Sequence, residues 1–472
     1  MKNKAEKKET STAVIAIWYV ISNVLVKGLA LITTPIFTRL MTKSEYGQFS
    51  NFTSWESIIT IIVTLDFSAS IMRAKYDFKD EMKKYMSSIV LFGNMVTLAI
   101  YVIIELNSSF FVKLFAMDMR YIRMLFVYLL FMPAFSYLQV EHRIFGKYKF
   151  FVLYSVGAAI LRTAISVLLV CFCEDKLFGR ISGYLVPMIL LNVCLWIFIV
   201  GRGKGISWKC VKYACMISIP LIPHALAGTA LSSSDKIMIT QYCGEETTAL
   251  YSIAYMVAAT ASLLWVSMNQ AWSPWTFDQL NLGRLEDVKK ASKLYLAVFA
   301  ALIVGVLLIA PEVVLILGGQ QYYEARYVMP PVILGGAFQF IYGLYVNIEI
   351  YMKKTFTISV GTVGAAILNI ALNMIFIPRY GYMAAAYTTL LGYIALLVFH
   401  YFTVKRIAGE YLHTYDGRFI MEIIVLLCCV SAISLWLYDH LIVRYSLIIA
   451  YVVVLMFILY KYRTKILHIF KR

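Results

Sequence analysis

The chain has 472 residues, of which 61% are hydrophobic and only 15% are charged. Soluble domains carry about 25% charged residues, so this composition excludes an ordinary soluble globular protein. A formal net charge of +17 would suggest a nucleic-acid partner for a soluble protein. Most of the 43 Lys and Arg residues, however, lie between long apolar stretches. We therefore expect no nucleic-acid partner and interpret the charge as a signal of membrane topology.

Apolar stretches long enough to cross a membrane recur from one end of the chain to the other. A spanning helix needs about 20 mainly apolar residues. The sequence predicts an all-α polytopic membrane protein with about fourteen transmembrane helices. They are expected near residues 13–40, 46–73, 85–105, 121–141, 149–173, 181–200, 213–240, 248–276, 293–317, 328–352, 355–378, 382–404, 418–438 and 441–460. Lys and Arg concentrate in the segments on the amino-terminal side, which predicts that both termini are cytoplasmic.

A repeated sequence divides the chain into similar halves. Residues 147–170, KYKFFVLYSVGAAILRTAISVLLV, align without gaps with residues 354–377, KTFTISVGTVGAAILNIALNMIFI. We predict a six-helix lobe over 1–200, a cytoplasmic linker over 201–212 and a second six-helix lobe over 213–405. Residues 406–472 would add two helices and a basic tail. Because each lobe has an even number of spans, both copies of the repeat cross the membrane in the same direction. Parallel repeats of this kind are found in transporters.

The small residues of the repeated motif are expected to serve packing. Gly157, Ala158 and Ala159 in the first copy, like residues 364–366 in the second, would let helices approach closely. Only their repetition carries functional information.

Two basic residues fall deep inside predicted spans. Lys27 lies about 13 residues into the first span, roughly 20 Å at 1.5 Å per residue, and Arg162 is similarly deep in the fifth. Charge in hydrocarbon costs at least a few kcal/mol, so we favour a cavity-facing role for both over a structural ion pair. Glu56 and Asp66 on the second span are candidates either for counter-ions or for coupling-ion sites.

A broken helix is predicted where the seventh span begins. Pro220 and Pro223 each remove a backbone donor, and irregular backbone at that depth is tolerated only against protein or a wet cavity. His224 follows directly and is a candidate for the cavity. Asp235 and Lys236, farther along this span, are expected either to pair with each other or to line the outer mouth.

Four further polar residues lie near predicted span ends. Arg39 and Arg73, taken alone, are interpreted as interfacial anchors. Asn269 and Gln270 lie one turn deeper than a pair of interfacial tryptophans and are cavity candidates.

Enzyme signatures are missing from the sequence. It contains no P-loop, no HExxH and no GxSxG, and its eight cysteines show no metal-binding spacing. We expect no catalytic residue, no metal and no cofactor beyond a possible coupling ion, H⁺ or Na⁺, or the membrane potential.

Several stretches resemble one known family. PIFTRLMTKSEYGQFS, IPLIPHALAGTALSSSDKIMI, NQAWSPW and IPRYGYMAAAYTTLLGY are similar to segments of the bacterial oligosaccharide-lipid and polysaccharide flippases, in the MOP exporter superfamily. The resemblance covers roughly 1–405. It implies a V-shaped pair of helix bundles in the bacterial inner membrane that moves a polyprenyl-pyrophosphate-linked oligosaccharide to the outer leaflet. The implied partners are this substrate, membrane lipids, and the glycosyltransferases and polymerase of the same pathway, and the protein would be a monomer.

The resemblance also implies a central cationic cavity for the pyrophosphate. Lys27, Arg39, Arg73 and Arg162 match that need. Asp66, in TLDFSAS, departs from the family, which usually has a small neutral residue there. Alternatives that remain open at this point are a cation-coupled multidrug exporter, a lipid II flippase and, from another class, a membrane-embedded glycan polymerase or acyltransferase.

Overall fold

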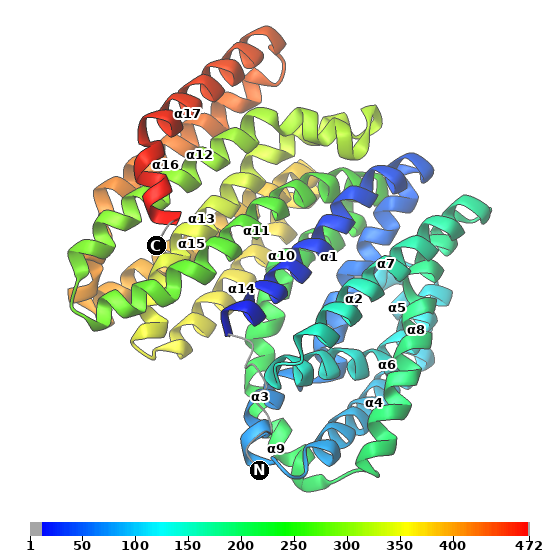
Figure 1. The fold of residues 1–472 in the computed structure, drawn as a ribbon. Helices are drawn as coiled ribbons and strands as arrows, with labels where there is room; N and C mark the ends of the chain where they lie inside the picture. The colour runs from blue at the N-terminus through cyan, green and yellow to red at the C-terminus, as the bar shows by residue number, and fades with distance from the viewer. Residues whose placement is uncertain (1–11, 471–472) are drawn as a thin grey trace, which may run out of the picture. The chain divides into compact units, whose positions relative to one another are not determined.

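The computed structural model describes residues 12–470, with some side chains inside helices left out, and contains helices and no strand in that range (Figure 1). The predicted all-α membrane fold is confirmed. Thirteen helical segments of the described chain are long and apolar enough to cross a membrane. They coincide with thirteen of the predicted spans, and the remaining one, 248–276, lies within the 37-residue helix α11 (Glu245–Asn281). The predicted cytoplasmic position of residues 1–11 lies outside the described residues.

The chain forms two compact units, residues 1–252 with 362–385 and residues 253–361 with 386–472. Unit 1 holds α1 (Thr12–Leu40), α2 (Lys43–Thr64), α3 (Ser68–Asp77), α4 (Met82–Leu106), α5 (Ser108–Phe115), α6 (Met119–Ile144), α7 (Tyr148–Phe172), α8 (Lys176–Gly203), α9 (Trp208–Ser218), the 3₁₀ turn η1 (Ile219–Leu221) and α10 (Ile222–Cys243). Unit 2 holds α12 (Leu285–Gly318), η2 (Gln320–Val328), α13 (Met329–Tyr351), η3 (Gly409–Thr414), α16 (Gly417–Leu437) and α17 (Leu441–Phe470). Three helices contribute residues to both: α11, α14 (Thr355–Tyr380) and α15 (Tyr382–Ile407).

The two compact units are defined by which residues pack together, whereas the predicted lobes are defined by the sequence repeat. The division of the chain into two six-helix lobes therefore stays a prediction. The repeat itself has a structural counterpart. α7 and α14 each begin one residue after the lysine with which the alignment of the two copies starts, Lys147 and Lys354.

α7 and α8 pack closely in unit 1, and the glycines of α8 make this possible. A Cβ at Gly179 would lie 2.8 Å from the Leu169 carbonyl oxygen, and one at Gly183 would lie 2.3 Å from the Ser166 Cα. This is a GxxxG contact, in which absent side chains let two helix backbones touch. The expectation for the repeated motif is right for Ala158 and Ala159, which are buried, and wrong for Gly157, which has nothing within 4 Å of its Cβ position.

Gly183→Ala should therefore destabilise the protein, because the added methyl group has no space between α7 and α8. We expect a loss of about 1–3 kcal/mol of unfolding free energy, as for other overpacked sites. Thermal unfolding of the purified protein in detergent measures it. Gly157→Ala is the matched control and should unfold like the wild type or slightly later, since alanine favours helix. Equal losses in both variants would contradict the packing argument.

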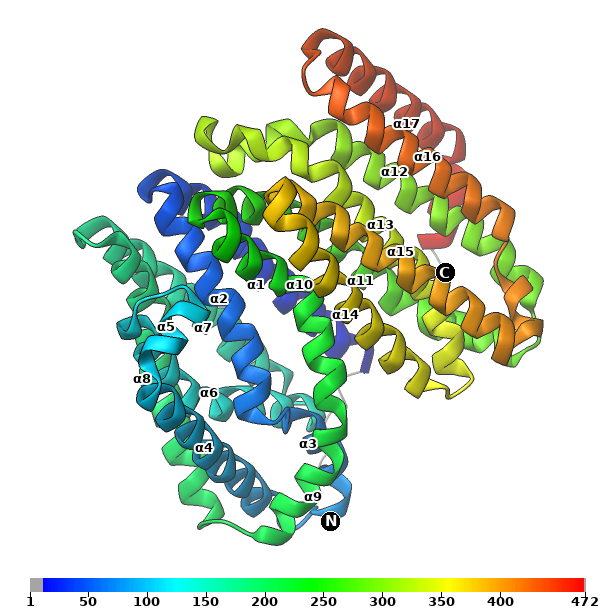
Figure 2. The ribbon, with the colours of Figure 1, turned by 180° about the vertical axis from the view of Figure 1, so that it is seen from behind.

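α2 also packs along α10 within unit 1, as Figure 2 shows from behind. At the start of α2, Gln48 donates to Glu245 Oε1 at 2.6 Å and Ser44 donates to Glu245 Oε2 at 2.5 Å. The backbone is equally close, because a Cβ at Gly47 would lie 1.9 Å from the Glu245 carbonyl oxygen. We call this contact of Ser44, Gly47 and Gln48 with Glu245 the α2–α11 clamp.

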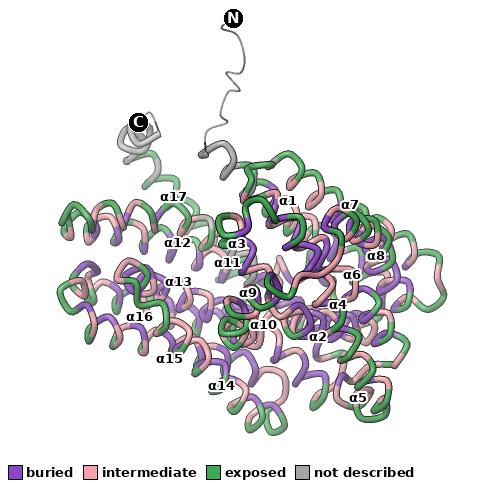
Figure 3. Tube along the Cα trace, turned by 90° about the horizontal axis from the view of Figure 1, so that it is seen from below, coloured by how far each residue is buried: buried purple, intermediate pink, exposed green. Residues whose placement is uncertain are grey.

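Unit 2 is organised around α13, which is buried along most of its length, whereas α17 is largely exposed (Figure 3). Phe340 of α13 stacks on Phe299 of α12 with ring centroids 3.7 Å apart, and on Tyr295 at 5.0 Å. The outer surfaces of α16 and α17 carry exposed apolar side chains such as Trp436 and Phe457. Such faces suit a lipid environment.

Candidate functional site

The deep arginine and the glutamate that the sequence singled out meet in unit 1 around one tyrosine. Tyr184 of α8 donates its hydroxyl hydrogen bond to Glu56 Oε2 of α2 at 3.0 Å. The Arg162 guanidinium of α7 lies over the Tyr184 ring, 4.2 Å from its centroid. Arg162 is half-buried and Glu56 is only 9% exposed. The three side chains therefore form one polar cluster within a membrane-spanning bundle.

A second arginine of this cluster, Arg180, escaped the sequence analysis. Its guanidinium lies 3.4 Å from the ring centroid of Phe37 on α1 and 4.3 Å from that of Phe49 on α2. Its Nε has no hydrogen-bond partner among the described residues. Aromatic faces attract cations by their quadrupole, but they do not neutralise the charge.

Helix packing sets these positions. Tyr184 lies one turn after Arg180 on α8, so both side chains share a face of that helix. The GxxxG contact fixes α8 against α7, and Ser166 of α7 donates to the Arg180 carbonyl oxygen at 3.2 Å. Arg162 precedes Ser166 by one turn and so reaches the same face. The local sequence thereby holds two cations on neighbouring helices.

The cluster carries an excess of positive charge. Arg162 interacts electrostatically with both Glu56 and Arg180, attracting the first and repelling the second. The cluster thus contains two guanidinium groups and one carboxylate, and only Arg162 has a recorded interaction with that carboxylate. Unpaired charge inside a membrane protein requires a wet cavity or a ligand of opposite sign. Guanidinium groups bind phosphate through two parallel hydrogen bonds, which makes an anionic phosphate the chemically matched ligand.

The contacts recorded for two of the other predicted cations, Arg39 and Arg73, are with residues outside this cluster. Lys27 is exposed on α1, so its predicted cavity position stays a prediction. Arg39 is exposed at the end of α1 and donates to the Pro35 carbonyl oxygen at 2.8 Å. Arg73 is exposed on α3 and pairs with Asp77 at 3.2 Å. The geometry of the last two fits the interfacial interpretation.

Asp66 lies at a break in the second span. Leu65 and Asp66 both have positive φ, 50° and 47°, and separate α2 from α3. Aspartate adopts this left-handed conformation more readily than most residues because its short side chain can hydrogen-bond locally. Here Ser68 donates to Asp66 Oδ1 at 2.9 Å. The departure from the family at this position therefore has a backbone explanation.

A fully buried polar network surrounds Asp235 elsewhere in unit 1. Tyr251 donates to Asp235 Oδ2 at 2.5 Å, and Asn373 of α14 donates to Oδ1 at 2.7 Å. Asn373 also lies 3.3 Å from the Asn369 side-chain oxygen. Asn369 is the residue that aligns with Arg162 in the repeat. The first copy thus has a cation where the second has an amide.

The remaining predicted residues are spread over both units. Pro220 lies in the 3₁₀ turn η1 and Pro223 in the first turn of α10, so the helix changes type at the predicted break. His224 is half-buried, and its Nδ1 has no partner among the described residues. Two more residues of the predicted set, Lys236 and Gln270, are half-buried and exposed respectively.

Asn269 makes a specific contact within unit 2. Its side-chain oxygen accepts a hydrogen bond from Asn347 of α13 at 2.8 Å. This amide pair joins α11 to α13, which is a packing role.

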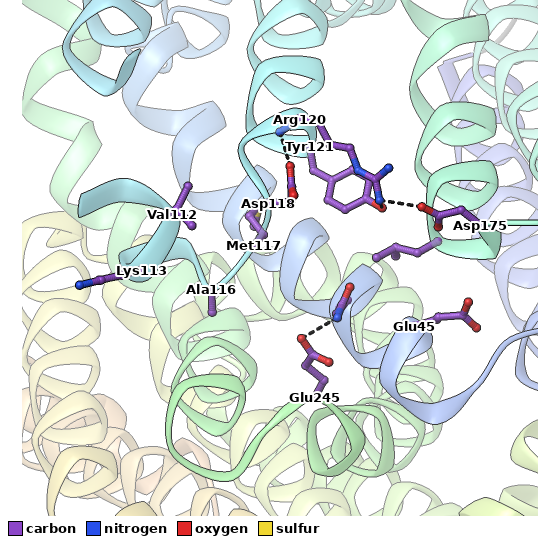
Figure 4. Close-up of a pocket in the computed structure, with 12 residues that line it drawn as sticks. Glu45, Val112, Lys113, Ala116, Met117, Asp118, Arg120, Tyr121, Asp175 and Glu245 are labelled. Carbon is purple, nitrogen blue, oxygen red and sulfur yellow. Dashed lines mark hydrogen bonds and ion pairs between the residues drawn. The ribbon is translucent and has the colours of Figure 1, made fainter. Parts of the chain in front are cut away.

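A hollow of about 590 Å³ with several charged residues in its lining opens in unit 1 where several helices begin (Figure 4). Its charged lining residues are Glu45, Lys113, Asp118, Arg120, Asp175 and Glu245. Asp175 caps α8 by accepting from the Phe178 backbone at 2.8 Å and pairs with Arg120 at 2.6 Å. Although burial acts to raise the pKa of Asp175, the hydrogen bonds from Phe178, Arg120 and Tyr121 and the charge of Arg120 together hold that pKa below its usual range. The carboxylate serves the helix start.

Comparison with protein families gives a match over residues 15–279 to the family described as polysaccharide biosynthesis protein. The match covers more than half of the chain. The chain belongs to the polysaccharide biosynthesis protein family. Comparison with curated protein sequences gives no match.

Solved structures of similar fold support the assignment of the architecture. The lipid II flippase MurJ in an inward closed conformation matches with a TM-score of 0.67 and 13% identity, covering 92% of this chain and 100% of that one. An inward-facing multidrug resistance MATE family transporter of the MOP superfamily matches with a TM-score of 0.57 and 14% identity, over 81% and 94%. A MOP superfamily transporter from Pyrococcus furiosus gives 0.51 and 14%, over 83% and 95%. This polysaccharide biosynthesis family member therefore has the fold of MOP superfamily transporters.

The family match contains the whole arginine cluster. Glu56, Arg162, Arg180 and Tyr184 all fall within residues 15–279.

Proposed function

We propose that this family member is a flippase for polyprenyl-diphosphate-linked oligosaccharides. It would carry them from the cytoplasmic to the outer leaflet of the bacterial inner membrane by alternating access, in the synthesis of a surface polysaccharide. The observation that carries the proposal is the position of two guanidinium groups, Arg162 over the Tyr184 ring and Arg180 over the Phe37 ring, in a cluster of unit 1 that holds one carboxylate, Glu56.

A diphosphate is the part of such a substrate that cannot cross hydrocarbon unaided. Two guanidinium groups in a medium of low dielectric constant attract it strongly. The prenyl tail needs no site, since it stays in lipid while the headgroup crosses. Cationic drugs, by contrast, are repelled by the same cluster. We therefore rank the flippase above the multidrug exporter.

Orientation and coupling belong to the proposal as well. The excess of Lys and Arg on the amino-terminal side supports cytoplasmic termini. Transport would be coupled to H⁺, to Na⁺ or to the membrane potential, and the buried Asp235 is held in unit 1 by two side-chain hydrogen bonds that it accepts. The proposal includes no catalytic step, and the protein would act as a monomer beside the glycosyltransferases and polymerase of its pathway.

Leaflet transfer in reconstituted vesicles tests the function. A fluorescent undecaprenyl-diphosphate oligosaccharide is placed in one leaflet and its arrival in the other is timed, beside protein-free vesicles and beside efflux of a cationic dye. We expect transfer of the glycolipid and no efflux of the dye. If the dye is exported and the glycolipid is not transferred under any imposed ion gradient or membrane potential, the proposed flippase function is wrong. The multidrug exporter then becomes the favoured function.

A further inference from the structure

Three polar side chains from three helices meet in the interior of unit 2. His400 Nδ1 of α15 lies 2.6 Å from Glu349 Oε1 of α13, and Thr357 of α14 donates to Glu349 Oε2 at 2.5 Å. Glu349 is 0% exposed by its side chain and His400 only 1%. A carboxylate and an imidazole buried together in a membrane-spanning bundle are expensive to charge and are functional candidates by default.

One atom of this group is left without a partner. The second imidazole nitrogen, His400 Nε2, is buried and has no hydrogen bond among the described residues. It points toward α14 at Gly361, where an added Cβ would lie only 3.3 Å from it. With Nδ1 and both carboxylate oxygens engaged, Nε2 is the place where this cluster can gain or lose a proton.

Few other titratable groups contact the pair. On α13, the Tyr342 ring stacks on the imidazole with centroids 5.5 Å apart. On α14, the recorded contacts are Thr357 and Gly361, which do not titrate. Lys353 and Lys354, in the turn before α14, are exposed, and Lys354 reaches Glu349 only through its backbone N–H. Among the described contacts, the balance of charge is therefore set by Glu349 and His400 themselves.

We propose that Glu349 and His400 form a proton-binding site, loaded and unloaded at His400 Nε2. In the loaded state an imidazolium donates from Nδ1 to the carboxylate, and the pair is neutral overall. Loss of the Nε2 proton to water leaves a neutral imidazole that still donates from Nδ1, so the site carries one net negative charge.

Unloading must then change the packing of α14. Water has to reach Nε2 to remove the proton, and the charge left behind is stabilised only by hydration or by a cation. The first turns of α14, from Thr355 to Gly361, cover the site and are held to it through Thr357. When residues 355–361 separate from α13 and α15, water can reach His400 Nε2. Proton loss and local opening of this segment are thus one coupled step.

The use of this site for transport rests on the proposed flippase function, whereas the site itself does not. In a flippase, the proton could leave this site only when the start of α14 separates from its neighbours. Movement of the proton across the membrane would therefore be coupled to a change in helix packing. The class of coupling ion would then be H⁺.

Hydrogen exchange on the full-length protein in nanodiscs tests the site without transport. Protection factors correct for the intrinsic effect of pH on exchange. We expect those of residues 355–361 to fall by about tenfold or more between about pH 5 and about pH 8. His400→Gln should abolish this dependence. His440→Gln, which changes an exposed histidine of the same unit, should retain it. Protection that is independent of pH in the wild type, or dependent on pH in His400→Gln, would overturn the site.

A second measurement covers variants that fail to fold. NMR of ¹³C-labelled histidine should show one buried imidazole whose protonation changes together with the exchange of 355–361, assigned because its signal persists when the other five histidines are replaced. An imidazole that keeps one protonation state over this range would also overturn the site.

Transport separates the two proposals. If transfer of the glycolipid occurs and an imposed proton gradient accelerates it in wild type but not in His400→Gln, the site is the coupling site. Transfer that responds to the gradient equally in both proteins overturns the coupling role. Absence of any transfer together with pH-dependent exchange overturns the flippase and leaves the proton site standing.

Discussion

Replacing Arg162 with alanine should slow leaflet transfer of the diphosphate-linked glycan by roughly ten- to hundredfold, because a hydrogen bond to a charged group contributes about 1.5–3 kcal/mol. The loss is expected in transfer rather than in folding, since the guanidinium contacts a ring face and not a buried carboxylate at close range. Arg162→Lys keeps the charge but loses the planar fork, so it should fall between alanine and the wild type.

The control for this variant is Arg418→Ala, which removes an exposed arginine paired with Glu422 on α16. It should transfer the glycolipid at the rate of the wild type. The double variant Lys27→Ala/Arg162→Ala then asks whether Lys27 belongs to the path. A further loss beyond Arg162→Ala places Lys27 in it, and equal rates exclude it. Transfer by Arg162→Ala at the wild-type rate would remove the arginine cluster from the mechanism.

Gly47→Ala should block the α2–α11 clamp, with a large effect on transport. The new methyl group would lie 1.9 Å from the Glu245 carbonyl oxygen, and backbone cannot yield as a flexible side chain would. The start of α2 must then separate from the α10–α11 junction, breaking the hydrogen bonds of Ser44 and Gln48 to Glu245. We expect loss of most transfer activity, because one closed state of the transport cycle can no longer form.

Cysteine labelling measures the opening directly. Cys243, at the end of α10, is half-buried, and it is left as the single cysteine of a variant in which the others are replaced. Its reaction with a membrane-impermeant maleimide should accelerate in Gly47→Ala. The matched control is Gly228→Ala on α10, where a Cβ meets nothing within 4 Å. Unchanged labelling in Gly47→Ala, with transfer intact, would show that the clamp is not needed.

The sequence was most informative where a charge interrupts an apolar run. Arg162 and Glu56 were found in this way, and the structure brings both to Tyr184. Asp235 was found for the same reason. The membrane fold followed from the length of the apolar stretches, because a bilayer imposes one thickness on every span.

Arg180 was missed because the helix containing it begins earlier than predicted. The span was expected at 181–200, which left Arg180 in a loop, whereas α8 begins at Lys176. Asp175 was the available signal, since an aspartate that caps a helix by accepting from the third residue beyond it marks the start. The aromatic rings of Phe37 and Phe49 come from other helices, so no local pattern could have placed them beside Arg180.

His400 and Glu349 were missed for a different reason. They are 51 residues apart in the chain, and each taken alone resembles a polar residue near a span end. Only the packing of α13, α14 and α15 shows that His400 Nδ1 and Glu349 Oε1 lie 2.6 Å apart. The left-handed backbone conformation of Asp66 could not be predicted either. It depends on the break between α2 and α3 and not on the residues next to Asp66 in the sequence.

Arg162 and Asn369 occupy equivalent places in the two copies of the repeat, and only one of them is a cation. If the copies arose by duplication, they began alike and later diverged at this position. A substrate that is bound by only one copy of the repeat breaks fewer interactions with the protein when it dissociates. A transporter must release its cargo as well as capture it, and site affinity that is too high slows exit. If Arg162 holds the diphosphate as we propose, the unequal charge of the two copies would favour rapid turnover over tight retention.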